Sequence, residues 1–151
     1  MSPIVHEVDI DRPPDQVYAY ATDPTRFPTW QRDVTSARMQ RGSPQEVGAT
    51  FATSRRIAGI EVIQCQEVVE ANPPTRWAAR AVDGPIRADA SVAIEPLDNG
   101  SRSRVTFTLD FEGPGIGRLM VPQVRRMAAK AAPNSYRALK ELLEQRPAGS
   151  P

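Results

Sequence analysis

Six consecutive segments of strand length, each closed by turn residues, constrain the fold of this chain more than any other feature. They are VTSARMQRG (34–42), GATFATSRRIAG (48–59), IEVIQCQEVVEA (60–71), TRWAARAVDG (75–84), IRADASVAIEP (86–96) and RSRVTFTLDFEG (102–113). Glycine, proline, asparagine and aspartate separate them, as is typical of turns. Their short, regular spacing leaves no room for crossover helices, so the pattern predicts an antiparallel meander.

A further strand is predicted before this meander. The segment 4–10 alternates in the manner of a half-buried strand. One face carries Ile4, His6, Val8 and Ile10, and the other carries Val5, Glu7 and Asp9. The prolines at 13 and 14 end that strand and can begin a helix, because the first helical position needs no backbone N–H donor.

The stretch ATDPTRFPTW (21–30) is predicted to form a corner between two short helices. Asp23 can cap the second helix, and Pro24 suits its first position. Pro28 keeps that helix short. We expect Phe27 and Trp30 to point inward and hold the corner against the rest of the fold.

From Ile116 onward the apolar period becomes helical. The predicted stripe comprises Ile116, Met120, Val124, Met127, Ala131, Leu139 and Leu142. Pro133 falls within it and removes one backbone hydrogen bond, so we expect a kink or a split near Ala132. The predicted class is α+β, with a curved seven-stranded antiparallel sheet wrapped around a long C-terminal helix. Residues 1–145 would form one domain, and 146–151 a flexible tail.

Composition excludes several classes of function. The chain has 151 residues, 19 basic and 18 acidic side chains and a net charge of +1. No run of like charges stands out, so we expect neither nucleic acid nor an anionic membrane surface as a partner. His6 and Cys65 are the only histidine and cysteine, so we expect no disulfide within the chain, no metal site and no cofactor. Without a secretory signal or an 18-residue apolar run, a cytoplasmic protein with no membrane span is expected.

Small side chains occupy the centre of the predicted sheet. Ala79 and Ala81 share a face with Trp77, and Ala88 and Ala90 share a face of the next segment. Protein interiors are close-packed, so alanines beneath a long helix indicate either very close helix packing or a cavity. We favour the cavity, because methionines on the helix would suit an adjustable wall.

The stretch RPPDQVYAYATDPTRFPTW resembles the N-terminal signature of the polyketide cyclase/dehydrase and lipid-transport family, in the START/pollen-allergen-like (SRPBCC) superfamily. VGATF, EVVEANPPTRWAARA, IEPLDNGSRSRVTFTLDFEG and RALKELLE resemble family stretches in order and spacing. This resemblance implies a helix-grip fold over nearly the whole chain. Pro133 departs from the family, whose C-terminal helix is usually continuous.

The resemblance implies a protein that binds a small hydrophobic ligand, aromatic or polyketide-like, in a cavity between the sheet and the C-terminal helix. The alternative is an enzyme of the cyclase/dehydratase type that uses the same cavity. A third interpretation is an interaction module, which would require an exposed apolar patch. The sequence decides neither whether a reaction is catalysed nor the oligomeric state, for which a homodimer is one option.

The candidate site residues follow from these faces. Predicted ligand contacts are Tyr20, Trp30, Phe51, Trp77, Ala79, Ala90, Phe107, Met120 and Met127. If the protein is an enzyme, His6, Tyr20 and Arg55 are the predicted catalytic groups. One of Arg55 and Arg56 must face inward if their strand is regular, whereas a bulge would place both outside. Each histidine, tyrosine and tryptophan here also has a purely structural interpretation, and Tyr136 is a second candidate polar group for the cavity.

Overall fold

A seven-stranded antiparallel sheet forms the body of the protein. The structure, a computed structural model, describes residues 3–57, 59–84 and 86–145. The strands are β1 (Ile4–Ile10), β2 (Val34–Arg41), β3 (Thr50–Ile57), β4 (Ile60–Asn72), β5 (Arg76–Ala81), β6 (Arg87–Leu97) and β7 (Arg102–Glu112). Their order is β1-β7-β6-β5-β4-β3-β2, which confirms the predicted meander and adds β1 beside β7. The predicted tail, 146–151, lies outside the described residues.

The chain crosses from one edge of the sheet to the other through short helices, as predicted. These are α1 (Pro14–Ala21), η1 (Pro24–Arg26) and α2 (Phe27–Trp30). The Asp23 carboxylate accepts a hydrogen bond from the Thr25 backbone N–H at 3.0 Å, which is the predicted cap. Phe27 and Trp30 are both buried. The corner therefore directs its two aromatic side chains into the core.

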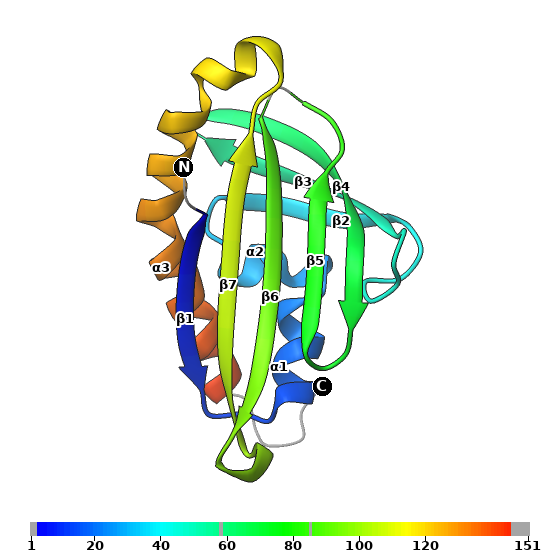
Figure 1. The fold of residues 1–151 in the computed structure, drawn as a ribbon, viewed down its shortest axis with the longest axis vertical. Coiled ribbons are helices and arrows are strands. Elements are labelled where there is room, and N and C mark those ends of the chain that lie inside the picture. Colours follow the sequence, from blue (N-terminus) through cyan, green and yellow to red (C-terminus); the bar gives the residue numbers. More distant parts are fainter. Residues whose placement is uncertain (1–2, 58, 85, 146–151) are drawn as a thin grey trace.

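The sheet is strongly curved. Figure 1 shows β2 and β3 running across the direction of β5, β6 and β7, so that the sheet encloses a concave face. Register shifts interrupt β2 at 34–36 and 39–41 and β4 at 68–70. Such bulges bend a strand and increase its twist. They explain how one continuous sheet forms two walls of the same concave face.

The long helix α3 (Val121–Gln145) lies beside β1 (Figure 1). The short turn η3 (Gly115–Leu119) connects β7 to this helix. Another short turn, η2 (Asp98–Gly100), lies earlier in the chain and connects β6 to β7. The Lys140 ammonium donates to the Asp9 carbonyl at 2.6 Å, and the Asp11 N–H donates to the Glu144 carboxylate at 2.9 Å. These bonds fix the C-terminal half of α3 to the end of β1.

The buried face of α3 differs from the predicted stripe. It comprises Val121, Arg125, Ala132, Ser135, Tyr136, Leu139 and Leu143, whereas the predicted Ile116, Met120, Met127 and Ala131 are exposed. Residues 116–119 belong to the separate turn η3, and α3 begins only at Val121, so Ile116 is not part of the helical stripe. Within α3, the buried residues lie on a different side of the helix from the predicted Met127 and Ala131.

The predicted split at Pro133 does not occur, because α3 continues through this residue. A proline at position 133 deprives the Ala129 carbonyl of its helical donor. Ala129 lies on the exposed side of the helix, so water can replace that bond. The free-energy cost of having a proline inside the helix is thereby reduced.

Replacing Leu139, which is 0% exposed in the core, should destabilise the fold. We expect Leu139→Ala to lower the free energy of unfolding by about 2–5 kcal/mol, because it leaves a cavity under α3. Leu119→Ala is the matched control, because Leu119 is 81% exposed and should cost less than about 0.5 kcal/mol. Urea unfolding measures both. Equal effects would contradict the burial of Leu139 and the exposure of Leu119.

Candidate ligand site on the concave sheet face

Three aromatic rings meet at the centre of the concave face. Phe107 of β7 and Tyr136 of α3 lie parallel, with ring centroids 4.0 Å apart and an interplanar angle of 6°. Trp30 of α2 adds a third ring, 6.0 Å from Phe107 and 6.4 Å from Tyr136. These separations are those of attractive aromatic pairs. The sheet, the corner and the long helix are thus joined through one contact.

Phe27 extends this cluster toward the far wall of the sheet. Its ring packs edge-on against Trp30 at 5.8 Å, Phe51 at 6.0 Å and Trp77 at 6.4 Å. Trp30, Phe51, Trp77 and Phe107, four predicted ligand contacts, are therefore brought together and are all buried. Aromatic side chains therefore fill the middle of the concave face.

The alanine-rich part of the face continues from the cluster toward the start of α3. Ala79 pairs with Ala90, which pairs in turn with Leu109 of β7. Leu109 and Phe111 follow Phe107 on the concave face and remain partly exposed, although β7 is a central strand. The helix therefore does not seal the concave face at this end.

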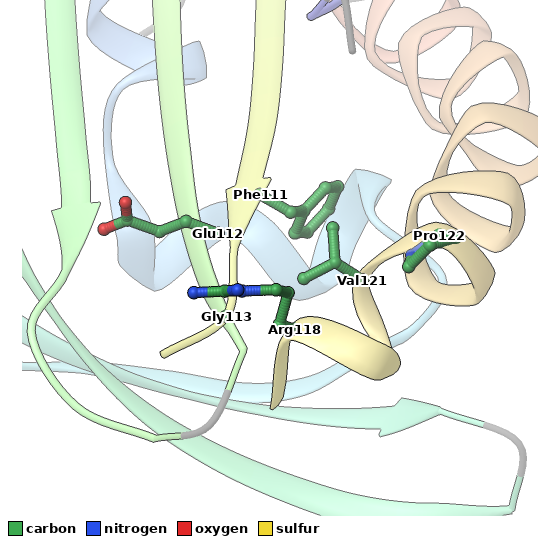
Figure 2. A pocket seen from close by; sticks show the side chains of 6 residues that line it. All are labelled: Phe111, Glu112, Gly113, Arg118, Val121 and Pro122. Atoms are coloured by element: carbon green, nitrogen blue, oxygen red, sulfur yellow. The ribbon is translucent and has the colours of Figure 1, made fainter. Parts of the chain in front are cut away.

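A pocket of about 420 Å³ opens between the end of β7 and the start of α3. It is lined by Phe111, Glu112, Gly113, Arg118, Val121 and Pro122. Figure 2 shows the side chains of Phe111 and Val121 pointing toward each other, while Glu112 points away. A Cβ atom at Gly113 would lie 2.5 Å from the Gly117 backbone, so the turn can close only around a glycine. It is an open depression between the strand end and the helix rather than an enclosed cavity.

An ion pair fixes the wall of this pocket to the helix. Arg125 is buried and pairs with the carboxylate of Asp110. The Phe111 N–H also donates to that carboxylate at 2.9 Å. This backbone hydrogen bond, together with the bond from Arg125, holds the pKa of Asp110 below its ordinary value. The pair is ionised at neutral pH and positions the first turns of α3 against β7.

The two tryptophans differ in one respect that matters for binding. The Trp77 indole N–H donates to the Pro44 carbonyl at 3.0 Å. The Trp30 indole N–H is buried and has no hydrogen-bond partner among the described residues. A buried donor without an acceptor costs about 1–3 kcal/mol, so a native structure that retains one needs an explanation. An acceptor atom on a bound molecule would supply one.

The Tyr136 hydroxyl is a second polar group without a partner in the described residues. Burial raises its pKa to about 12, and the nearby Arg55 guanidinium opposes that shift only in part. The hydroxyl is therefore neutral at physiological pH and can donate a hydrogen bond. Tyr136 is a polar candidate on sequence grounds, and the structure places it beside Trp30.

His6 and Arg55 approach the same region from opposite walls. The His6 ring centroid lies 5.3 Å from that of Tyr136. Arg55 faces inward and donates to Asp33 at 3.1 Å and to Gln31 at 3.0 Å, while Arg56 is exposed. Asp33 and Gln31 follow directly after α2, so the corner holds the arginine. Two of the three predicted catalytic residues thus lie around Tyr136.

Three other predicted site residues lie elsewhere. The Tyr20 hydroxyl is hydrogen-bonded to the Thr29 hydroxyl at 2.8 Å, and the Arg26 guanidinium covers its ring at 4.8 Å. Met120 is 50% exposed and Met127 is 37% exposed, near the start of α3. Their roles as ligand contacts remain predictions.

Sequence reasoning did not select a buried polar pair on the same face. The Thr53 hydroxyl of β3 is 3.4 Å from the Gln66 side-chain oxygen of β4, and both residues are buried. The available signal was that Gln66 shares the inward face of its strand with Val68.

The described residues hold no cluster of three histidine, cysteine or acidic side chains that could bind a metal. No helix in the described ranges has the length and apolar character needed to cross a bilayer.

The family model for polyketide cyclase/dehydrase and lipid transport matches residues 1–144, and the chain belongs to this family. The Zhui aromatase/cyclase from a Streptomyces species is similar in fold, with a TM-score of 0.82 and 14% identity, over 99% of this chain and 98% of that chain. A protein from Thermus thermophilus, TTHA0849, has a TM-score of 0.75 and 20% identity, over 93% of this chain and 96% of that chain. A START superfamily protein from Mycobacterium smegmatis has a TM-score of 0.73 and 14% identity, over 96% of this chain and 99% of that chain. A search of curated proteins found no match.

The raised pKa of Tyr136 predicts a loss of stability in alkali. Between about pH 10 and pH 12 the unfolded tyrosine releases its proton while the folded one retains it. The unfolded state then binds fewer protons, so stability falls by up to about 1.4 kcal/mol per pH unit from this group. Denaturant unfolding across that range should show a shallower decline for Tyr136→Phe. Identical slopes for the variant and the parent would contradict the buried hydroxyl.

Proposed function

We propose that the protein binds a small hydrophobic molecule, aromatic or polyketide-like, on the concave face between the sheet and α3. The observation that carries the proposal is the buried N–H of Trp30, which has no partner among the described residues, on an indole whose ring lies 6.4 Å from the Tyr136 ring. This N–H and the Tyr136 hydroxyl both lie within an aromatic cluster, so the complementary molecule is apolar and carries at least one oxygen acceptor. The family description, which names polyketide cyclases and lipid transport, supports the same class of ligand.

Burial of apolar surface would drive the binding, and the two donors would orient the ligand. A flat ring can lie along the aromatic cluster, as the rings of Phe107 and Tyr136 do with each other. The pocket between Phe111 and Val121 offers an opening to the partly exposed end of the concave face. We propose the cytoplasm as the place of action, which suits a chain with a single, unpaired cysteine.

A cyclase/dehydratase-type enzyme is the second candidate, and the grouping of His6, Arg55 and Tyr136 favours it. Closing a ring in a poly-β-ketone begins with removal of a proton from a carbon between two carbonyl groups. A histidine can accept that proton, while a neutral tyrosine and an arginine can stabilise the developing enolate oxygen. The similarity in fold to an aromatase/cyclase is compatible with this chemistry.

Trp30→Phe tests the binding proposal, because it keeps an aromatic ring while removing the N–H donor together with part of the indole. The probe is 1,8-dihydroxyanthraquinone, a flat apolar molecule with carbonyl and phenolic oxygens, and its dissociation constant is measured by calorimetry. We expect binding by the parent and about fivefold to tenfold weaker binding by the variant, as for the loss of one hydrogen bond.

Trp77→Phe is the matched control, since the Trp77 indole already donates to Pro44. The same ring change there should weaken probe binding less than Trp30→Phe does, because the donor that it removes is already used by the Pro44 carbonyl. Native mass spectrometry of the purified protein adds a test that is independent of the chosen probe, because it detects a co-purifying apolar molecule. Absence of both binding and a retained molecule would contradict the proposed function.

The second candidate is tested by proton exchange in deuterated water. The protein should accelerate exchange at the carbon between the carbonyls of 1-phenylbutane-1,3-dione, and both His6→Gln and Tyr136→Phe should reduce the rate by about tenfold or more. Trp77→Phe again serves as the control. Exchange no faster than in buffer would favour binding without catalysis.

A further inference from the structure

One segment of the chain carries a concentrated positive charge that the balanced composition conceals. Between Gly113 and Lys140 the sequence contains no aspartate or glutamate. The same stretch contains Arg118, Arg125, Arg126, Lys130, Arg137 and Lys140. All 18 acidic residues therefore lie outside it, although the net charge of the chain is only +1. The expectation that an anionic membrane surface is not a partner was drawn from the charge of the whole chain, and it needs revision for this segment.

Four of these cations are exposed and form no ion pair among the described residues: Arg118, Arg126, Lys130 and Arg137. The other two are paired, Arg125 with Asp110 and Lys140 with Glu144. At 3.6 residues per turn, positions 126, 130 and 137 share one face of α3, opposite the buried face. The outer side of the helix thus presents a row of cations with no counter-charge in the described part of the chain.

Large apolar side chains are exposed on the turn before this row and near the start of the helix. Ile116 is 78% exposed and Leu119 is 81% exposed, both on η3. Met120 and Met127 follow at 50% and 37%. Figure 1 shows η3 projecting at one extremity of the molecule, directly before α3. We call these four residues, together with the four unpaired cations, the basic–apolar surface.

We propose that the basic–apolar surface docks the protein on an anionic lipid bilayer. Cations near a membrane attract anionic headgroups, and apolar side chains at a protruding turn can enter the boundary between headgroups and acyl chains. An acidic protein partner would meet the same charge, but protein interfaces rely on side chains seated in well-packed pockets. Ile116 and Leu119 instead project from a short turn, a form that suits insertion into lipid.

The geometry links this surface to the candidate ligand site. Arg118 belongs to the basic–apolar surface and also lines the pocket between β7 and α3 (Figure 2). Docking through η3 would therefore bring the pocket opening close to the bilayer, where apolar molecules partition. The docking itself does not depend on the proposed ligand: vesicle binding without probe binding would support the surface and contradict only the function.

Vesicle co-sedimentation of the full chain tests the proposal. The vesicles contain phosphatidylcholine with about 30% phosphatidylserine, compared with phosphatidylcholine alone, at about 0.05 M and 0.5 M salt. We expect binding to the anionic vesicles only, with a large decrease at high salt. The double variant Arg126→Gln/Lys130→Gln should bind about 25-fold more weakly, which is about fivefold per cation. Leu119→Ser should also weaken binding, because it removes an inserting side chain.

Matched controls separate this surface from net charge and from general hydrophobicity. Arg38→Gln/Arg41→Gln removes the same charge from exposed β2 positions that have no ion pair with any described residue, and Val5→Ser removes a 60%-exposed apolar residue from β1. Both should bind anionic vesicles like the parent, and circular dichroism confirms that each variant is folded. The proposal is overturned if the parent does not bind anionic vesicles at low salt, which would leave an acidic protein as the partner to seek. Equal losses in the control and test variants would also overturn it.

Discussion

The stacking of Phe107 on Tyr136, with Trp30 against both, is the contact on which the rest of the structure depends. It joins a central strand, the long helix and the corner of short helices, which are far apart in the sequence. Aromatic side chains supply the largest apolar areas in a core and prefer defined relative orientations. The contact therefore stabilises the fold and also fixes the floor of the candidate ligand site.

The same contact determines how the concave face is divided. On one side the aromatic cluster is closed by Phe27, Phe51 and Trp77, so the core is packed there. On the other side small alanines and the partly exposed Leu109 lead to the pocket at the start of α3. The buried indole N–H of Trp30 belongs to this cluster and has no acceptor among the described residues. A molecule bound against it would have to supply a hydrogen-bond acceptor.

Local rules predicted most of the fold, because turn residues bound each strand and Asp23 caps its helix as expected. They failed at 116–131, where the helix was expected from Ile116 and with Met127 and Ala131 inward, because tertiary packing decides which side of α3 meets the sheet. Of the site, strand alternation placed Phe107 and Trp77 on the faces that the structure buries, but it left open whether Arg55 or Arg56 faces inward. It could not give the pairing of side chains across distant elements, such as Tyr20 with Thr29, because those contacts arise only from tertiary packing.

Nuclear magnetic resonance of the two tryptophan indole N–H groups tests the central claim most directly, since the chain has only Trp30 and Trp77. Assignment follows from the two phenylalanine variants. In the free protein the Trp77 resonance should have the shift of a hydrogen-bonded indole and the Trp30 resonance that of an unbonded one. On addition of 1,8-dihydroxyanthraquinone the Trp30 resonance should move downfield while that of Trp77 stays in place. A Trp30 resonance that is already hydrogen-bonded in the free protein, or that does not respond to the ligand, would contradict the account.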